Sequence, residues 1–141
     1  MSIQRVDKLT SGSRTKEIYS DFLTNFNLHP NTGNLLKRTD IEAVKRSIRN
    51  LLLTDKGERM FQPDLGSNVR NYLFENTSSV TQNSLKESIT TTIKNYEKRA
   101  NLIDVIVALS NDEHSYNIDI YFTVINNPTV AVFNVQLDRV R

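Results

Sequence analysis

The segment IDVIVALSNDEHSYNIDIYFTVINNPTVAVFNVQL, residues 103–137, decides the fold because apolar and polar residues alternate along three successive runs in it. Alternation with a period of two is typical of strands that bury one face. Turn formers at residues 111–114 and 126–128 separate the runs. The segment therefore predicts a three-stranded antiparallel meander. The residues expected on its buried face are Ile103, Val105, Val107, Leu109, Ile118, Ile120, Phe122, Val124, Phe133, Val135 and Leu137.

Two amphipathic helices are expected before the meander, with a short helix between them. The first covers residues 40–52 and begins at a capping box formed by Thr39 and Glu42. The second covers residues 80–99 and has Ser79 as its start signal. Helices followed by strands indicate an α+β fold, in which the two main helices pack on one face of the meander. The apolar stripes expected to pack there are Ile41, Val44, Ile48, Leu51 and Leu52, and Leu85, Ile89, Ile93 and Tyr96.

The beginning of the chain is expected to lie outside this core. Residues 1–17 are polar and lack a sustained period, so we expect a flexible N-terminal arm there. A single α+β domain is expected over residues 18–141, since its length and composition suit one domain with one core.

Between the arm and the first helix, residues 18–28 favour a strand by their alternation. Ile18, Phe22 and Phe26 also fit one face of a helix, which leaves an alternative open. Turn formers dominate residues 29–34, HPNTGN, and predict a hairpin or a wide turn.

The composition excludes several classes of protein. A net charge of +2, from 18 basic and 16 acidic residues, is too balanced for a protein whose main task is to hold nucleic acid. The basic residues Lys45, Arg46 and Arg49 are interpreted as a solvated helix face, with a phosphate site as the alternative. The absence of cysteine fits a reducing compartment, and no stretch is long and apolar enough for a membrane helix.

The chain carries no sequence motif for a metal ion, a nucleotide or a covalent catalyst. His29 and His114 lie in predicted turns, and neither has cysteine or carboxylate neighbours at the spacing of metal ligands. The four glycines cannot form a phosphate-binding loop, and no serine lies in a nucleophile motif. We therefore expect no metal, no cofactor and no small-molecule substrate.

Paired carboxylates leave a glycoside hydrolase as an alternative. Glu58, Asp64, Glu75 and Glu97 could supply an acid and a base. The acid of such an enzyme needs a pKa raised by an apolar pocket, and tryptophan, a common platform for sugars, is absent from the chain. The expectation is therefore that the protein is not an enzyme, and that Glu58 and Arg59 are neighbouring, mutually compensated charges.

Residues 57–66, GERMFQPDLG, combine a constrained backbone with mixed charged and apolar side chains. Gly57 and Gly66 can adopt positive φ, and Pro63 fixes its own φ. A simple connector would not need such side chains, so we interpret this loop as a docking surface. The residues expected to contact a partner are Glu58, Arg59, Phe61, Pro63 and Asp64.

A charged pair follows at the expected end of the long helix. In an extended chain Glu97 and Arg99 point to the same side, where they would share one patch. Ordinary electrostatics at a helix C-terminus, with Lys98 and Arg99 close to the negative helix end, is the alternative.

The stretch VKRSIRNLLLTDKGERMFQPDLGSNVRNYLFE, residues 44–75, with the long helix ending in NYEKR and the meander, resembles a known family. This family is the small baseplate wedge proteins, or sheath initiators, of contractile-tailed phages, which have relatives in type VI secretion baseplates. The resemblance runs from about residue 22 to the C-terminus, and the GER-x-F-Q-P-D-x-G-S segment is its specific signature. The chain matches the family's Glu-Pro-Arg motif at Glu97 and Arg99, but Lys98 replaces the proline, which leaves the helix exit less rigid.

The resemblance implies a structural subunit of the virion's tail baseplate that is assembled in the host cytoplasm and needs no catalytic turnover, although some members are labelled lysozyme-like. The implied partners are other baseplate wedge proteins, the tail sheath protein and the tail tube around which the sheath polymerises. The implied mechanism is strand exchange between the meander and the first sheath ring. We expect residues 57–66, Glu97 and Arg99 to bind the wedge. The strand expected nearest the sheath contains Phe133, Val135 and Leu137.

Overall fold

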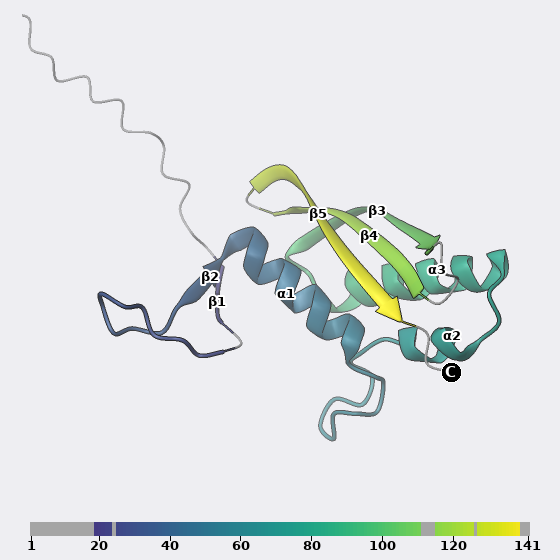
Figure 1. Ribbon diagram of the computed structural model, residues 1–141, viewed down its shortest axis with the longest axis horizontal. Helices are drawn as coiled ribbons and strands as arrows, with labels where there is room; N and C mark the ends of the chain where they lie inside the picture. The colour runs from purple at the N-terminus through teal and green to yellow at the C-terminus, as the bar shows by residue number, and fades with distance from the viewer. Residues whose placement is uncertain (1–18, 24, 111–114, 126, 139–141) are drawn as a thin grey trace, which may run out of the picture.

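The computed structural model describes residues 19–23, 25–110, 115–125 and 127–138, and these residues form a mixed α+β structure (Figure 1). The N-terminal arm expected at residues 1–17 lies outside the described residues. None of the helices in the described part of the chain is long and apolar enough to cross a membrane. The elements in order are β1 (Ser20–Phe22), β2 (Lys37–Thr39), α1 (Asp40–Leu53), α2 (Val69–Phe74), α3 (Ser79–Tyr96), β3 (Ala100–Leu109), β4 (Ser115–Val124) and β5 (Asn127–Asp138).

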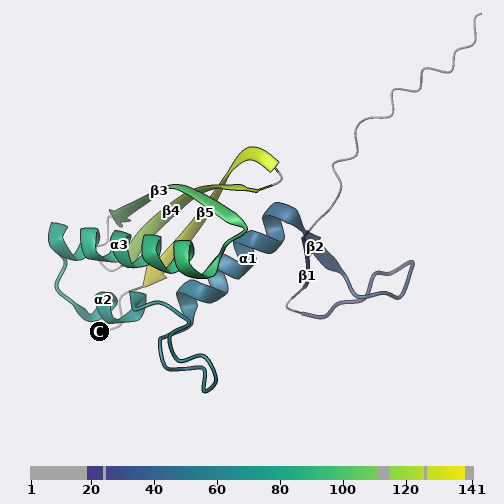
Figure 2. The same cartoon turned by 180° about the vertical axis from the view of Figure 1, so that it is seen from behind.

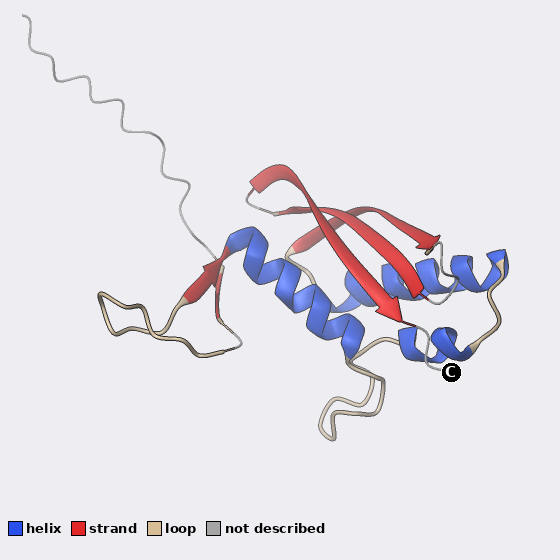
Figure 3. Ribbon diagram, in the orientation of Figure 1, coloured by secondary structure: helices blue, strands red, loops and turns tan. Residues whose placement is uncertain are grey.

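The last three strands form the predicted antiparallel meander in the order β3-β4-β5 (Figure 3). The central strand β4 alternates in burial, and Tyr116, Ile118, Ile120 and Phe122 are completely buried on one face. The pairing of β5 with β4 is uninterrupted over residues 131–138. The predicted meander with one apolar face is therefore confirmed.

A bulge in β3 changes which residues of that strand face the core. Leu102 pairs with Phe122 in β4. The next pair joins Asp104 to Tyr121, so Ile103 between them is an extra residue. The side chain of Ile103 is 57% exposed, and Leu102 packs against the core in its place. The prediction that Ile103 faces the core is wrong, because an inserted residue shifts the alternation by one position.

Both main helices pack on the same face of the sheet, as predicted. The long helix α3 lies along β3, whereas α1 lies against β4 and β5 (Figures 1 and 2). Most of their apolar stripes are buried, including Val44 and Ile48 in α1 and Leu85 and Ile89 in α3. Burial contributes roughly 1.5–3 kcal/mol for each such side chain, which offsets the poor helix propensity of the threonines at residues 90–92. Tyr96, which was expected to complete the stripe of α3, is 36% exposed, because its hydroxyl reaches out to the backbone of Asp64.

The start of α1 differs from the predicted capping box. Thr39 is the N-cap residue, but its side chain makes no capping hydrogen bond, and Glu42 pairs with Lys45 at 3.1 Å instead. Asp40 has a φ of +46°, and its backbone N–H donates to the carbonyl oxygen of Tyr19 at 2.7 Å. Pairing with the preceding segment therefore fixes the start of this helix in place of a side-chain cap.

The long helix α3 begins one residue earlier and ends three residues earlier than predicted. Ser78, and not Ser79, is its N-cap, and the Ser78 hydroxyl accepts a hydrogen bond from the backbone N–H of Thr81 at 3.1 Å. The helix ends at Tyr96 because the chain turns there to enter β3.

The strands β1 and β2 pair antiparallel and form a hairpin arm, residues 20–39, that projects from the rest of the molecule (Figure 1). A further bridge joins Leu28 to Leu35 nearer the turn. The hairpin prediction is therefore confirmed, whereas the strand covers only Ser20–Phe22 of the expected residues 18–28. The helical alternative is wrong, because Phe22 and Phe26 lie on an extended arm where both are exposed.

Candidate partner-binding surfaces

The loop of residues 57–66 is held in one shape by backbone hydrogen bonds. The N–H of Gly57 donates to the carbonyl oxygen of Pro63 at 2.8 Å, which closes the loop on itself. Gly66 has a φ of +133°, and a Cβ added there would lie 2.6 Å from the carbonyl oxygen of Thr54. The base of the loop therefore requires a glycine for two separate reasons.

Side chains outside the loop also hold it in place. The hydroxyl of Tyr96, at the end of α3, donates to the backbone oxygen of Asp64 at 2.5 Å. At the loop's base, the carboxylate of Asp55 accepts from Arg70 of α2 at 2.9 Å. The loop is thus anchored to two helices, which leaves its tip little freedom to collapse onto the protein.

The tip of this loop presents two large apolar side chains to solvent. Met60 is 91% exposed and Phe61 is 98% exposed. The carboxylate of Glu58 accepts from the backbone N–H of Asp55 at 3.0 Å, and among the described residues no ion pair joins it to Arg59. The expected compensation between these two charges is therefore wrong. The other residues predicted to contact a partner are exposed as well: Glu58, Arg59, Pro63 and Asp64.

Glu97 and Arg99 form a two-pronged ion pair just after α3. The Nε and Nη2 atoms of Arg99 donate to Oε1 and Oε2 of Glu97 at 2.6 and 2.7 Å. Glu97 is only 3% exposed, and Ser47 of α1 also hydrogen-bonds its side chain. Burial acts to raise the pKa of Glu97, but the hydrogen bonds from Arg99 and Ser47 and the charge of Arg99 outweigh it and lower the pKa below its ordinary value.

Arg99 also contacts Tyr19, just before the hairpin arm. We call the cluster of Glu97, Arg99, Ser47 and Tyr19 the Glu97–Arg99 junction. The guanidinium of Arg99 lies over the Tyr19 ring, 5.6 Å from the ring centre, and the Arg99 side chain is 34% exposed. The hydrogen bond to Glu97 raises the pKa of Arg99 further above its usual range. Lys98, in contrast, donates to the carbonyl oxygen of Lys94 at the end of α3. The predicted shared patch therefore holds for Glu97 and Arg99. The alternative, a cation that interacts with the C-terminal end of the helix, holds for Lys98.

No sequence pattern indicates the other two residues of this junction, Ser47 and Tyr19. Ser47 lies on α1, fifty residues before Glu97 in the chain, and Tyr19 precedes the hairpin arm. Neither residue belongs to a recognisable motif, so only the packing of α1 and the arm against the end of α3 identifies them.

The last strand, β5, lies at one edge of the meander. It pairs with β4 on one side, and no strand of the described chain pairs with its other side. The side chains of Phe133, Val135 and Leu137 face the core, where Leu137 is buried and the other two are partly buried. What this strand offers to a partner is therefore its backbone N–H and C=O groups.

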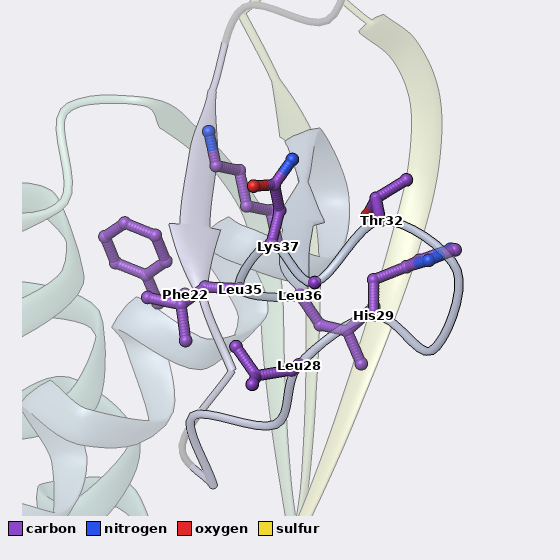
Figure 4. A pocket seen from close by; sticks show the side chains of 9 residues that line it. Phe22, Leu28, His29, Thr32, Leu35, Leu36 and Lys37 are labelled. Atoms are coloured by element: carbon purple, nitrogen blue, oxygen red, sulfur yellow. The ribbon is translucent and has the colours of Figure 1, made fainter.

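A shallow apolar depression lies on the hairpin arm (Figure 4). It is lined mainly by Phe22, Leu28, Leu35 and Leu36, and the Lys37 ammonium lies 5.9 Å from the centre of the Phe22 ring. This surface was not predicted from the sequence. In the described residues, no three His, Asp or Glu side chains gather as a metal site would require.

The architecture is shared with several solved structures. A putative tail lysozyme from Geobacter sulfurreducens superposes with a TM-score of 0.66 at 24% identity, covering 71% of this chain and 91% of that one. A chain of a type VI secretion baseplate complex gives 0.61 at 16% identity, with 72% and 94% covered. A chain of the anti-feeding prophage baseplate gives 0.59 at 22% identity, with 87% of each covered. These similarities establish the fold.

Sequence comparison identifies the family. The baseplate wedge protein gp25 of Enterobacteria phage T4 is 32% identical over 88 residues, which cover 62% of this chain and 67% of the phage protein. The profile of the family described as baseplate wedge protein gp25 matches residues 38–129, from β2 into β5. The resemblance inferred from the sequence is therefore confirmed, and the chain belongs to the gp25 family of baseplate wedge proteins, structural components of the baseplate of contractile tails.

Proposed function

We propose that this baseplate subunit docks on other wedge proteins and starts polymerisation of the tail sheath around the tail tube by exchanging β-strands with the first sheath ring. The observation that carries the proposal is the outer edge of β5. Over residues 131–138 this strand pairs regularly with β4, while its other side has no partner strand in the described chain. An edge of this length is a template for a strand from another polypeptide.

The loop of residues 57–66 is the proposed anchor on the wedge. Two fully exposed apolar side chains, Met60 and Phe61, cost free energy in water, and the hydrogen-bonded loop prevents them from folding back. Large side chains on a preformed loop lose little conformational freedom on binding, which favours affinity. Arg59, Pro63 and Asp64 would surround these side chains as a polar rim.

Glu97 and Arg99 are proposed to form a second contact with the wedge, through Arg99. Glu97 is buried, so its carboxylate serves to orient the guanidinium. Arg99 uses Nε and Nη2 for this bond, and its Nη1 has no hydrogen-bond partner among the described residues. A fixed, partly exposed guanidinium donor suits a carboxylate or a carbonyl oxygen on a neighbouring subunit.

The carboxylates do not favour the lysozyme alternative. A glycosidase acid needs a raised pKa, whereas the Arg99 contact leaves Glu97 with a lowered one. Glu58 and Asp64 lie on an exposed loop that lacks an apolar pocket to hold their protons. We therefore propose a structural subunit that performs no catalysis.

The nucleic-acid alternative loses support in the same way. Lys45 pairs with Glu42, and Arg46 hydrogen-bonds the carbonyl oxygen of Phe22 and lies 3.9 Å from a carboxylate oxygen of Asp21. These contacts engage two of the three cations on the basic face of α1, and the one left without an ion pair in the described chain, Arg49, does not make a run of cations along which a phosphate backbone could bind.

Electron cryo-microscopy of assembled tails tests the proposal directly. We expect a strand from a sheath subunit along the outer edge of β5, and the tip of loop 57–66 inserted into another wedge protein. A sheathed tail in which β5 has no foreign strand beside it would overturn the proposed mechanism. A paired β5 with a solvent-exposed loop tip would retain strand exchange and remove the docking role of the loop.

A further inference from the structure

A groove runs between α1, the hairpin arm and the open edge of β5. It is lined by Arg38 of β2, Lys45, Arg46 and Arg49 of α1, and Phe133 of β5. The α1 residues follow the spacing of a single helix face, so their side chains emerge on the same side. In Figure 1 the yellow strand β5 runs beside α1.

The groove has an excess of positive charge. Glu42 is its one carboxylate, and both Arg38, at 3.6 Å, and Lys45, at 3.1 Å, share it. Arg46 lies near Asp21 of the hairpin arm. Arg49, the α1 cation nearest the helix C-terminus, has no ion pair within the described part of the chain. Like charges gathered in this way favour an anionic occupant.

The position of the groove determines what that occupant is. A strand added to β5 would lie about 4.8 Å beyond it, and every second side chain would point toward the helix layer. The part of the helix layer that lies next to such an added strand is the face of α1 that carries Lys45, Arg46 and Arg49. The inward side chains of an added strand would therefore meet Lys45 and Arg49 near Phe133.

Farther along β5 the same border has no excess of positive charge and is richer in leucines. Beside Leu137 a second depression is lined by Leu52, Leu53 and Leu73, with Leu53 53% exposed. Its charged lining residues are Asp138 and the ion pair of Asp55 with Arg70. Leu137 lies four residues beyond Phe133, or about 13 Å along an extended chain. An incoming strand therefore meets cations at one end and leucines at the other.

We infer that the strand that completes β5 carries carboxylates at the inward positions opposite Phe133 and apolar side chains at the inward positions opposite Leu137. This inference rests on the proposed strand exchange and adds to it the chemistry and the alignment of the partner strand. Backbone pairing alone accepts any sequence, so the helix flank supplies the selectivity.

A tethered strand tests this selectivity in the chain of 141 residues. A Gly/Ser linker of about six residues and the strand Val-Thr-Val-Thr-Glu-Thr-Glu are appended after Arg141, so that the strand can return antiparallel along β5 at high effective concentration. Two matched extensions carry lysine or glutamine in place of both glutamates, and a fourth carries the linker alone. The measurement is the midpoint of thermal unfolding at low and at high salt.

We expect the glutamate extension to raise the midpoint above that of the lysine extension by about 3–6 °C at low salt, with glutamine between them. High salt should shrink the difference. Arg49→Glu should abolish it, whereas Lys94→Glu, the same charge change on the exposed side of α3, should leave it intact.

Failure of the inference and failure of the proposed strand exchange give different results. If the three strands stabilise the protein equally above the linker alone, the edge of β5 accepts a strand but does not select its charge, and the inference is overturned. If Lys94→Glu removes the difference as fully as Arg49→Glu, overall charge and not the groove is responsible, which also overturns it. If no strand stabilises the protein above the linker alone, the edge does not accept a strand, and the proposed exchange fails together with the inference.

Discussion

The Glu97–Arg99 junction and the loop of residues 57–66 were both predicted from sequence as partner-binding surfaces, but they are built in opposite ways. At the junction each carboxylate oxygen of Glu97 has a donor, and Glu97 is buried. On the loop the backbone is satisfied while Met60 and Phe61 are left in water. The difference indicates that the junction stabilises the fold and positions one arginine, whereas the loop leaves an apolar surface that only a partner can bury.

The largest effect on folding is expected from Arg99→Met, which would leave the Glu97 carboxylate buried with Ser47 as its remaining side-chain donor. Loss of one partner of a buried pair costs about 3–5 kcal/mol, and the partial exposure of Arg99 reduces our expectation to roughly 2–3 kcal/mol. Urea unfolding measures the change. The double variant Glu97→Gln, Arg99→Met should recover part of the loss, and a single-variant loss below about 0.5 kcal/mol would show that the junction does not stabilise the fold.

A smaller loss is expected from Gly66→Ala at the base of the loop. The new Cβ would lie 2.6 Å from the oxygen of Thr54 in a backbone conformation that disfavours side chains, so we expect about 2 kcal/mol of destabilisation. Gly57→Ala is the matched control, because its φ of +87° is also unfavourable but no atom lies within 4 Å of the added Cβ. Equal losses for the two variants would show that the close approach at Gly66 has no effect of its own.

Acid should weaken the junction in a predictable direction. The pKa of Glu97 is lower in the folded protein than its ordinary value of 4.5, so the unfolded chain takes up the proton first as the pH falls. The stabilisation is complete above pH 4.5 and is lost as the pH falls through the folded pKa. Urea unfolding from pH 7 to pH 3 should show a steeper decline for the native sequence than for Glu97→Gln. The exposed Asp104, whose pKa is lowered chiefly by its hydrogen bond with Lys86, is common to both proteins and cancels in the comparison. Parallel declines would contradict the assignment.

The smallest effect on folding and the largest effect on binding are expected from Met60→Ser and Phe61→Ser. Both side chains lie in water, so the free energy of unfolding should change by less than about 0.5 kcal/mol. If they anchor the subunit in the wedge, each substitution should weaken co-purification with wedge proteins by roughly 30-fold or more, as expected for a central contact. Val80→Ser, at an exposed apolar position on α3, is the control. Unchanged co-purification would remove the loop from the interface.

The sequence was sufficient where one physical pattern determined the outcome. The alternation in residues 115–137 predicted the inward faces of β4 and β5, and the helical stripes predicted the buried sides of α1 and α3. The strand faces and the helix faces each follow from the side-chain period of one element, and every residue in that element repeats the same period.

The sequence was insufficient where two distant segments compete for the same backbone or side chain. Ile103 fits the alternation, yet the register with β4 makes it the extra residue. Thr39 and Glu42 have the correct spacing for a capping box, yet the hydrogen bond from the Asp40 N–H to the Tyr19 carbonyl oxygen fixes the start of α1 instead. Glu97 was expected to present its charge to a partner, but Ser47 of α1 and Arg99 enclose it. Each of these outcomes depends on a contact between residues that no local pattern connects.

The two borders of the meander differ in how regularly they pair. The longest uninterrupted run of pairs with β4 is six in β3, beyond the bulge at Ile103, and eight in β5, whose register shifts between Phe122 and Val124 of β4. The Asp104 carboxylate next to the β3 bulge is bound to Lys86. Bulges and charged side chains hinder pairing at a sheet edge. If the subunit recruits a strand through β5, as proposed, growth by strand addition is directional, because the opposite border of the meander is blunted. Such a nucleus would start one ordered assembly without stacking edge to edge into an endless fibre.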